Sequence, residues 1–362
     1  MTKIHKQPYR LPPPLIPKEL LGMGYTCSSC SRQNQIDWIT PQPFPKQPIQ
    51  HIGGNNHYVP ASITQVCPCG HFNHIPFPTK ASESTWGLFG DEAEREFQEG
   101  ELPGVESKAH FFTISLATIH RDSALQFQQK LSDLKQAVRP DRAPSEWQLH
   151  MTNVWNLPPN TDGFALADKL EKVRFIRNVA SLLQKFRPDL FTINVSSCRV
   201  LSENDEWRKL VKTNKQEVFA TALITSLHLV RSNNKSLIWN FDHNVPPEKR
   251  NGSEGWAEEV FLGLQYSPVF TWLSAGSLVQ SPRFHIPGSH YLLEVADALS
   301  FLVARDFEQR TKGRLSDFPS SLTGVGHYQA FDENGSLSFR WNNGLPFDKF
   351  YPRLLTTKRR SK

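Results

Sequence analysis

Residues 289–307 read SHYLLEVADALSFLVARDF, and this helix-length apolar run carries two acids, Glu294 and Asp297. At about 100° per residue, one face of the predicted helix is a continuous apolar stripe, and the other faces are largely apolar too. We therefore expect the helix to be buried on most sides. A buried carboxylate is costly unless it is protonated, hydrogen-bonded, paired or bound to a cation. The sequence thus predicts a partner for Asp297, which can be a cation or simply Arg305 or solvent on a wetter flank.

The length and composition of the chain are those of a globular protein. Its 362 residues suggest about two or three domains, and 38% hydrophobic and 21% charged residues are ordinary for a folded, soluble chain. No charge-free apolar run reaches about 18 residues, the length that crosses a membrane. Residues 1–14, MTKIHKQPYRLPPP, lack the apolar core of a signal peptide. We therefore expect a cytoplasmic protein without a membrane segment.

Four of the five cysteines form two close pairs, Cys27 with Cys30 and Cys67 with Cys69, in a segment rich in proline. An odd number of cysteines without a secretion signal argues against a disulfide framework. Two thiolate pairs on turns are typical of a structural zinc site, whose four ligands leave no position for water. We therefore predict a zinc-ribbon module over residues 1–80, in which Zn²⁺ stabilises a segment with little core of its own.

The spacing of the second cysteine pair leaves its ligand set open. One residue separates the two cysteines instead of the usual two, so His71 or His74 can replace one sulfur. The alternative to the metal site is a set of unrelated buried or surface cysteines. The remaining cysteine, Cys198, stands alone in a predicted strand, where it is expected to be a small buried hydrophobic residue.

From about residue 84 the sequence has the pattern of a mixed α/β domain, which we place at residues 84–345 before a basic tail at 346–362. It contains no glycine-rich phosphate loop and no Gly-x-Ser-x-Gly motif. Strands are expected at 110–120, 190–200, 236–242 and 269–278, helices at 122–138, 162–186, 215–230 and 254–264, and a hairpin at 324–341.

Three acids occupy comparable places in this pattern. Asp91 ends a short apolar piece, Asp242 ends a predicted strand, and Asp297 lies on the late helix. Carboxylates at the ends of neighbouring strands, with one more from a helix across the sheet, can converge on one or two divalent cations. Such hard oxygen ligands suit Mg²⁺ or Mn²⁺, and a pair of these cations can cleave a phosphodiester. A turn or capping role is the alternative for each acid.

The acids also stand in segments that resemble a large bacterial family with a ribonuclease-H-like fold. That family typically opens with Asp-Glu-Ser and closes on a helix with Leu-Gln-x-Ala-Asp-x-x-Ala-Tyr. The resemblance spans roughly residues 84–310 and is most specific around Asp297. The segments that carry it are Asp-Glu-Ala at 91–93, Glu-Trp-Gln-Leu-His at 146–150, Trp-Asn-Phe-Asp at 239–242 and Leu-Glu-Val-Ala-Asp-Ala-Leu-Ser-Phe at 293–301.

This resemblance implies a ribonuclease-H-like mixed sheet with flanking helices and a site for Mg²⁺ or Mn²⁺. His150 and His243 are candidates for proton transfer or for contact with a phosphate. The site residues that it implies are the cation ligands Asp91, Asp242 and Asp297, with Glu92 or Glu294 completing the shell or orienting water.

Three departures from the family pattern bear on catalysis. The expected serine after Glu92 is Ala93, and the usual glutamine before the Ala-Asp pair is Glu294. The acid expected near the middle of the domain is Gln148, with Glu146 two residues earlier. These changes leave open that the fold persists while the nuclease chemistry is weakened or lost.

The function expected from these observations is a divalent-metal-dependent nuclease or nuclease-like protein. Its zinc ribbon would engage nucleic acid or a protein partner, and the net charge of +6 is compatible with a polyanion. The alternative is a non-catalytic scaffold that binds nucleic acid or a protein through the ribbon and the basic tail. A third reading is a degenerate fold that acts only as an oligomeric interaction module.

Overall fold

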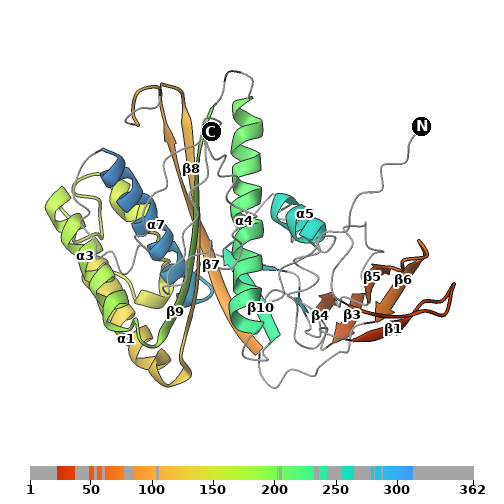
Figure 1. The fold of residues 1–362 in the computed structure, drawn as a ribbon. Coiled ribbons are helices and arrows are strands. Elements are labelled where there is room, and N and C mark those ends of the chain that lie inside the picture. The colour runs from red at the N-terminus through yellow and green to blue at the C-terminus, as the bar shows by residue number, and fades with distance from the viewer. Residues whose placement is uncertain are drawn as a thin grey trace. The chain divides into compact units, whose positions relative to one another are not determined.

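The computed structural model divides into two compact units (Figure 1). The first comprises Met1–Trp86, Leu223–Trp239 and Gly255–Pro282, and the second comprises Gly87–Ala222, Asn240–Glu254 and Arg283–Lys362. The hairpin, the strand at 269–278 and the basic tail expected from the sequence lie outside the described residues. The structure describes residues 23–36, 49–52, 55–58, 62–76, 85–102, 106–201, 203, 206–231, 236–242, 255–264, 279–280, 282–286 and 288–312.

The second unit is built on a mixed sheet flanked by helices, so the chain is α/β as expected. Strands β7 (Thr85–Phe97), β8 (Ala109–Ile119) and β9 (Leu190–Val200) form an antiparallel meander. Strand β10 (Ser236–Asp242) lies on the other side of β7, and β12 (Arg283–His285) pairs with β10 in parallel. The described strands of this sheet are therefore arranged in the order β9-β8-β7-β10-β12.

Strand β7 corrects one expectation from the sequence. The apolar piece was expected to end at Asp91, but the strand continues through the charged residues to Phe97. It does so because β8 pairs with it over this whole stretch, from Phe89 opposite Ala117 to Phe97 opposite Ala109. The ladder of backbone hydrogen bonds outweighs the low strand propensity of the acids. Asp91 consequently lies in the middle of a strand.

Helices cover both faces of this sheet. Figure 1 shows α1 (Arg121–Val138), α3 (Lys169–Lys185) and α7 (Tyr291–Thr311) on one side of β8 and β9, and α4 (Trp207–Arg231) on the other. The helix predicted at residues 289–307 is α7. Its side chains from Leu292 to Ala304 are all buried, Glu294 and Asp297 included. The expectation of burial on most sides is confirmed.

Three helix predictions need correction. The helix expected at 215–230 is α4, which begins already at Trp207. The helix expected at 162–186 begins only at Lys169, with Asp168 as its N-cap, and a short helix that was not expected, α2 (Met151–Asn156), precedes it. Helix α1 is capped by His120, whose side chain accepts a hydrogen bond from the Asp122 backbone N–H. The sequence had suggested Asp122 or Ser123 as the cap. These errors concern helix ends and one short helix, where a periodic pattern has too few residues to be recognised.

Among its described residues, the first unit contains short antiparallel strand pairs, helix α5 (Gly255–Leu264) and the end of α4 from Leu223. Strand β4 also pairs with β11 (Val279–Gln280), which pairs with β10 at Leu237. None of the helices in the described part of the chain combines the length and the apolar character needed to cross a bilayer. The paired strands are β1 (Gly24–Thr26) with β2 (Gln33–Gln35), β3 (Ile49–Ile52) with β4 (Asn55–Tyr58), and β5 (Ser62–Val66) with β6 (Phe72–Pro76).

Candidate functional site

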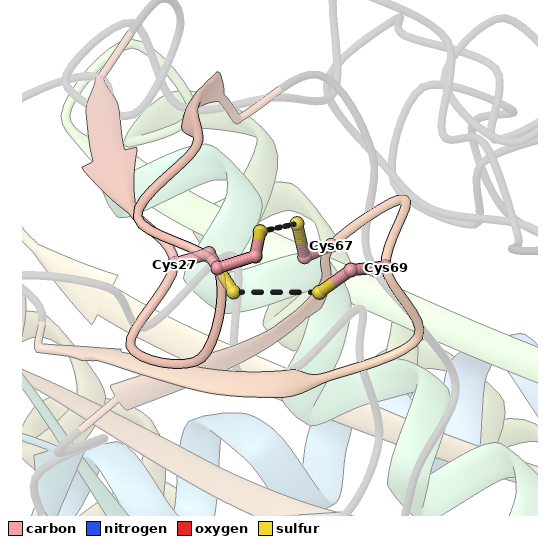
Figure 2. A group of neighbouring side chains, drawn as sticks. Cys27, Cys67 and Cys69 are labelled. Carbon is pink, nitrogen blue, oxygen red and sulfur yellow. Dashed lines mark hydrogen bonds between the residues drawn. The ribbon is translucent and has the colours of Figure 1, made fainter.

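The four N-terminal cysteines come together in the first unit, although up to 42 positions separate those in contact. Figure 2 shows sulfur atoms from the two cysteine turns facing one another. The Cys27 and Cys69 sulfurs lie 3.7 Å apart, the Cys30 and Cys67 sulfurs lie 3.6 Å apart, and all four lie within 4.8 Å of one another. A tetrahedral site with Zn–S bonds of about 2.3 Å places its sulfurs roughly 3.8 Å apart. The cluster can therefore bind a metal ion such as zinc.

Two tight turns present these sulfurs. Cys27 accepts a backbone hydrogen bond from Ser31, which has a φ of 58°, and Cys67 accepts one from Gly70, which has a φ of 87°. Positive φ at these positions reverses the chain directly after each cysteine pair. His71 is not in the cluster, because its Nε2 lies 2.8 Å from the Ser28 hydroxyl oxygen. All four sulfurs thus converge despite the short spacing of the second pair.

Asn73 joins the two turns from behind the sulfurs. Its side-chain oxygen accepts a hydrogen bond from the Ser28 backbone N–H at 2.9 Å, and its amide nitrogen lies 3.6 Å from the Cys27 sulfur. Burial raises the pKa of Cys27, but hydrogen bonds from the Cys30 and Ser29 backbone and from Asn73 outweigh it and lower the pKa to about 6. Cys27 is therefore readily a thiolate, the form that binds metal.

Cys69 has the opposite tendency when no cation is present. The His71 backbone N–H favours the Cys69 thiolate, but hydrogen bonding with the Cys30 thiol and burial outweigh it and raise the pKa of Cys69 to about 12. When several thiols lie close together, the first to lose its proton makes it harder for the others to do so. A thiolate with a low pKa beside a thiol with a high pKa is therefore expected here. Cys198 takes no part: it is buried beside Phe111, and burial raises its pKa to about 12.

The acids expected to form the second site all lie in the second unit. Asp91, in the middle of β7, is 7% exposed. Burial raises the pKa of Asp91 well above its ordinary value, and the charges of Asp297, Glu92 and Asp242 raise it further. Only the backbone N–H of Glu92, 2.8 Å from an Asp91 oxygen, opposes this effect. The charges of Asp242 and Asp297 therefore act on Asp91, and we call these three aspartates the acidic centre.

The neighbouring strands β7 and β10 supply two of these aspartates. Gly90 precedes Asp91, and a Cβ atom there would lie only 2.5 Å from the Phe241 ring. Because Gly90 has no side chain, the Phe241 ring can pack directly against the backbone of β7 at this position. Asp242, the next residue, is the last of β10. It accepts a hydrogen bond from the Gln148 side-chain amide at 2.8 Å.

Helix α7 supplies the third aspartate, which already has protein partners. One Asp297 oxygen accepts a hydrogen bond from the Met151 backbone N–H at 2.6 Å. The other oxygen lies 2.8 Å from Nδ1 of His150, close enough for an ion pair, although the ring nitrogen is not aligned for a hydrogen bond. This contact raises the pKa of His150 against the effect of burial, and Asp242 adds to it. The partners of Asp297 are thus the His150 imidazole and the backbone N–H of Met151, the first residue of α2.

The two glutamates proposed as neighbours of the acids lie elsewhere. Glu92 follows Asp91 in a regular strand, so their side chains project to opposite faces of the sheet. Glu294 is buried on α7 and pairs with Lys135 at 2.5 Å. Burial raises the pKa of Glu294 above its ordinary value although Lys135 opposes the shift. Its place on the same helix as Asp297 was expected, whereas its lysine partner was not.

Two residues of this site were not identified as candidates from the sequence. His285 of β12 pairs with Asp242 in the parallel ladder, and its Nε2 lies 2.8 Å from the Asn240 side-chain oxygen. Burial and Arg283 lower the pKa of His285. Gln148, noticed only as a departure from a family pattern, contacts Asp242 directly. Strand β12 has only three residues, too few for a periodic signal. His243 lies outside the described residues.

The two groups of ligands differ in spacing. Within the described part of the chain, the four cysteines are the group of three or more His, Cys, Asp or Glu side chains whose ligand atoms all lie within 4.8 Å of one another. The aspartates are spaced more widely, as mutually repelling carboxylates are without a cation. No model of a known protein family and no curated protein matches this chain.

Proposed function

We propose that the second unit is a divalent-metal-dependent nuclease or nuclease-like domain of the ribonuclease-H-like class. The observation that carries the proposal is that Asp91 and Asp242 lie on the neighbouring strands β7 and β10, while Asp297 lies on α7, whose Ser300 hydroxyl donates to the Asp91 backbone oxygen at 2.6 Å. A buried acid whose pKa neighbouring carboxylates raise holds a proton that a divalent cation can replace. The strand order, a meander whose first strand is flanked by two later strands, also supports this class.

The three aspartates are the residues that would hold Mg²⁺ or Mn²⁺, because both cations prefer oxygen ligands. When bound, such a cation activates water and stabilises the leaving oxygen of a phosphodiester. His150 is 45% exposed, and Asp297 raises its pKa, so its ring would keep a positive charge to higher pH than an ordinary histidine and could contact a phosphate. His285 has a lowered pKa and would stay neutral, as a proton acceptor must.

The experiment compares wild type with Asp91→Asn on single- and double-stranded DNA and RNA in Mn²⁺ and in Mg²⁺. Asp91 is the best position to change, because the hydrogen bond that its carboxylate accepts comes from the Glu92 backbone N–H and not from another side chain of the site. We expect Mn²⁺-dependent cleavage by wild type and none by the variant. Asp133→Asn, an exposed acid on α1, is the control and should cleave normally. Cleavage that survives Asp91→Asn, or no cleavage by wild type, would exclude the catalytic proposal.

A non-catalytic scaffold is a second candidate that a specific observation favours. The Gln148 amide occupies one oxygen of Asp242, and both oxygens of Asp297 have protein partners. If this arrangement excludes the cation, wild type will bind no Mn²⁺ in electron paramagnetic resonance titrations, whereas Gln148→Glu will bind it. Equal Mn²⁺ binding by the two proteins would argue against the scaffold.

For the first unit we propose a zinc ribbon that engages nucleic acid or a protein partner. The near-tetrahedral spacing of the four sulfurs and the exposed Cys30 and Cys69 turns support it. Nucleic-acid binding would weaken steeply with salt, persist without added Mg²⁺ or Mn²⁺ and be lost on zinc chelation. Nucleic-acid binding that persists after zinc chelation would mean that the ribbon is not the part that binds.

A further inference from the structure

A short extended segment of the second unit, residues 147–151, links α7 to the acidic centre, and we call it the strap. Its backbone is extended at Trp147, with φ and ψ of −147° and 150°, and at His150, with −117° and 111°, before Met151 begins α2. Its successive side chains therefore alternate in direction. Leu149 and Met151 are fully buried, whereas Gln148 and His150, which alternate with them along the chain, are partly exposed.

The strap is fastened to α7 by its backbone. The Leu149 N–H donates to Glu294 at 2.9 Å, and the Met151 N–H donates to Asp297 at 2.6 Å. Two residues along an extended chain rise roughly 6.5 Å and three residues along a helix rise roughly 4.5 Å, a difference that long acidic side chains can bridge, so alternate strap amides reach acids one helical turn apart. Glu294 and Asp297 thus each accept one backbone hydrogen bond from the strap.

Lys135 of α1 contacts both the strap and Glu294 of α7. Its ammonium group donates to Glu294 at 2.5 Å and to the Trp147 backbone oxygen at 2.6 Å. The same Glu294 oxygen accepts from both Lys135 and Leu149. The Lys135 and Glu294 side chains are 7% and 4% exposed. One buried ion pair therefore holds the strap backbone at Trp147 and at Leu149.

The partly exposed side chains of the strap turn to the acidic centre. Gln148 donates to Asp242, and His150 lies against Asp297, each at 2.8 Å. Gly288, with a φ of 78°, lies beside this point, and a Cβ atom there would approach the Gln148 Cβ to 3.3 Å. The strap therefore decides which groups cover two of the three aspartates.

We propose that the buried Lys135–Glu294 pair is a positioning device for the acidic centre, which fixes the strap against α7 so that Gln148 and His150 lie on Asp242 and Asp297. Glu294 is thus a positioning residue and not a cation ligand. A buried ion pair is often replaceable by apolar side chains without loss of stability. Such a replacement would still remove the acceptor for the Leu149 N–H. The position of the strap can therefore be tested separately from the stability of the domain.

The test uses the full chain with the apolar double substitution Lys135→Met and Glu294→Met. Hydrogen exchange resolved to single amides should show the Leu149 amide exchanging roughly tenfold faster or more, while the amides of β8 keep wild-type rates. Glu294→Gln retains an oxygen acceptor and should restore protection of Leu149. The exposed pair Lys130 and Asp133 on the same helix, changed to Met and Met, is the matched control.

The consequence for cations rests on the proposed function and is measured separately. If the acidic centre binds Mn²⁺, the affinity of the Lys135→Met, Glu294→Met protein should differ from wild type, whereas the control pair should not change it. If wild type binds no Mn²⁺, the proposed function fails but the exchange experiment still decides the positioning role. Wild-type exchange at Leu149 in the apolar double variant, or equal acceleration throughout β8 and α7, would overturn the inference.

Discussion

The cysteine cluster and the acidic centre show two ways in which a chain gathers ligands for a cation. The four cysteine sulfurs lie within 4.8 Å of one another. The aspartates interact but stand farther apart, and Asp242 and Asp297 already have protein partners. Thiols can lie in contact because they can be neutral, whereas carboxylates that approach each other must take up a proton or a cation.

The surroundings of the two groups explain the rest of the difference. Around the cysteines, the described apolar residues that are buried are few, chiefly Ile36 and Ile75. The acidic centre lies among the aromatic and aliphatic side chains packed around α7. A segment with little core depends on its cation for stability, whereas a domain with a full core can keep its fold when the site is changed. The predictions below test this contrast.

The largest effect is expected at the cysteine cluster. Cys27→Ser should abolish binding of one zinc per chain and unfold the module around it, because structural zinc contributes about 10–16 kcal/mol to comparable peptides at neutral pH. Elemental analysis and hydrogen exchange of residues 23–36 and 62–76 would measure this. Cys198→Ala, remote from the cluster, should retain the zinc. Wild-type protein that contains no zinc after expression in zinc-supplied cells would remove the contrast.

A smaller effect is expected from breaking the buried ion pair. Lys135→Met leaves Glu294 buried without its cation, which should lower the free energy of unfolding by about 3–5 kcal/mol. Because Glu294 can then take up a proton, the loss should be greatest well above its ordinary pKa of about 4.3 and should shrink in acid. Denaturant unfolding at several pH values measures it. The exposed Lys130→Met should change stability by less than about 0.5 kcal/mol. A loss independent of pH would point to packing alone.

Asp91→Asn should change the free energy of unfolding with pH in the opposite sense to Lys135→Met: it should stabilise the protein at neutral pH. Because its pKa is raised in the folded state, the stability that its proton contributes is present below about pH 3.9 and is lost as pH rises through the folded-state pKa. Each unit of pKa difference corresponds to about 1.4 kcal/mol. Asp91→Asn should therefore be more stable than wild type at neutral pH in a chelator, and this advantage should fade toward pH 4.

The control for Asp91 is a divalent cation. Adding Mn²⁺ should stabilise wild type and leave Asp91→Asn unchanged, because a cation that binds only the folded state shifts unfolding by mass action. Asp133→Asn should behave as wild type under both conditions. Equal stability profiles for wild type and Asp91→Asn across this pH range would mean that Asp91 is not crowded by the other acids.

The smallest effect is expected behind the cysteine sulfurs. Asn73→Ala removes the amide that contacts the Cys27 sulfur and the acceptor for the Ser28 N–H. Loss of such an outer contact typically weakens a metal site about 10–100-fold. Competition with a chromogenic chelator would measure the change in zinc affinity. Gln35→Ala, an exposed residue of β2, should have no effect, and a similar loss there would assign the change to general loosening of the module.

Much of the fold could be predicted from local patterns. Strand β9 and strand β10 lie at the predicted bounds, and α7 begins two residues after the predicted start of its apolar run. Pairing decided what patterns could not: the acidic half of β7 is a strand because β8 lies beside it. The ribonuclease-H-like resemblance stays a prediction, as does catalysis.

The sequence by itself determined that four cysteines form two close pairs and that α7 carries acids on an apolar surface. Both follow from residue type and spacing, which are local properties. Only the tertiary structure decided what each acid faces: His150 and Met151 beside Asp297, Lys135 beside Glu294. Lys135 and Glu294 are 159 positions apart, so their contact has no local signal. Burial makes a partner necessary, but the packing of α1, the strap and α7 selects which partner it is.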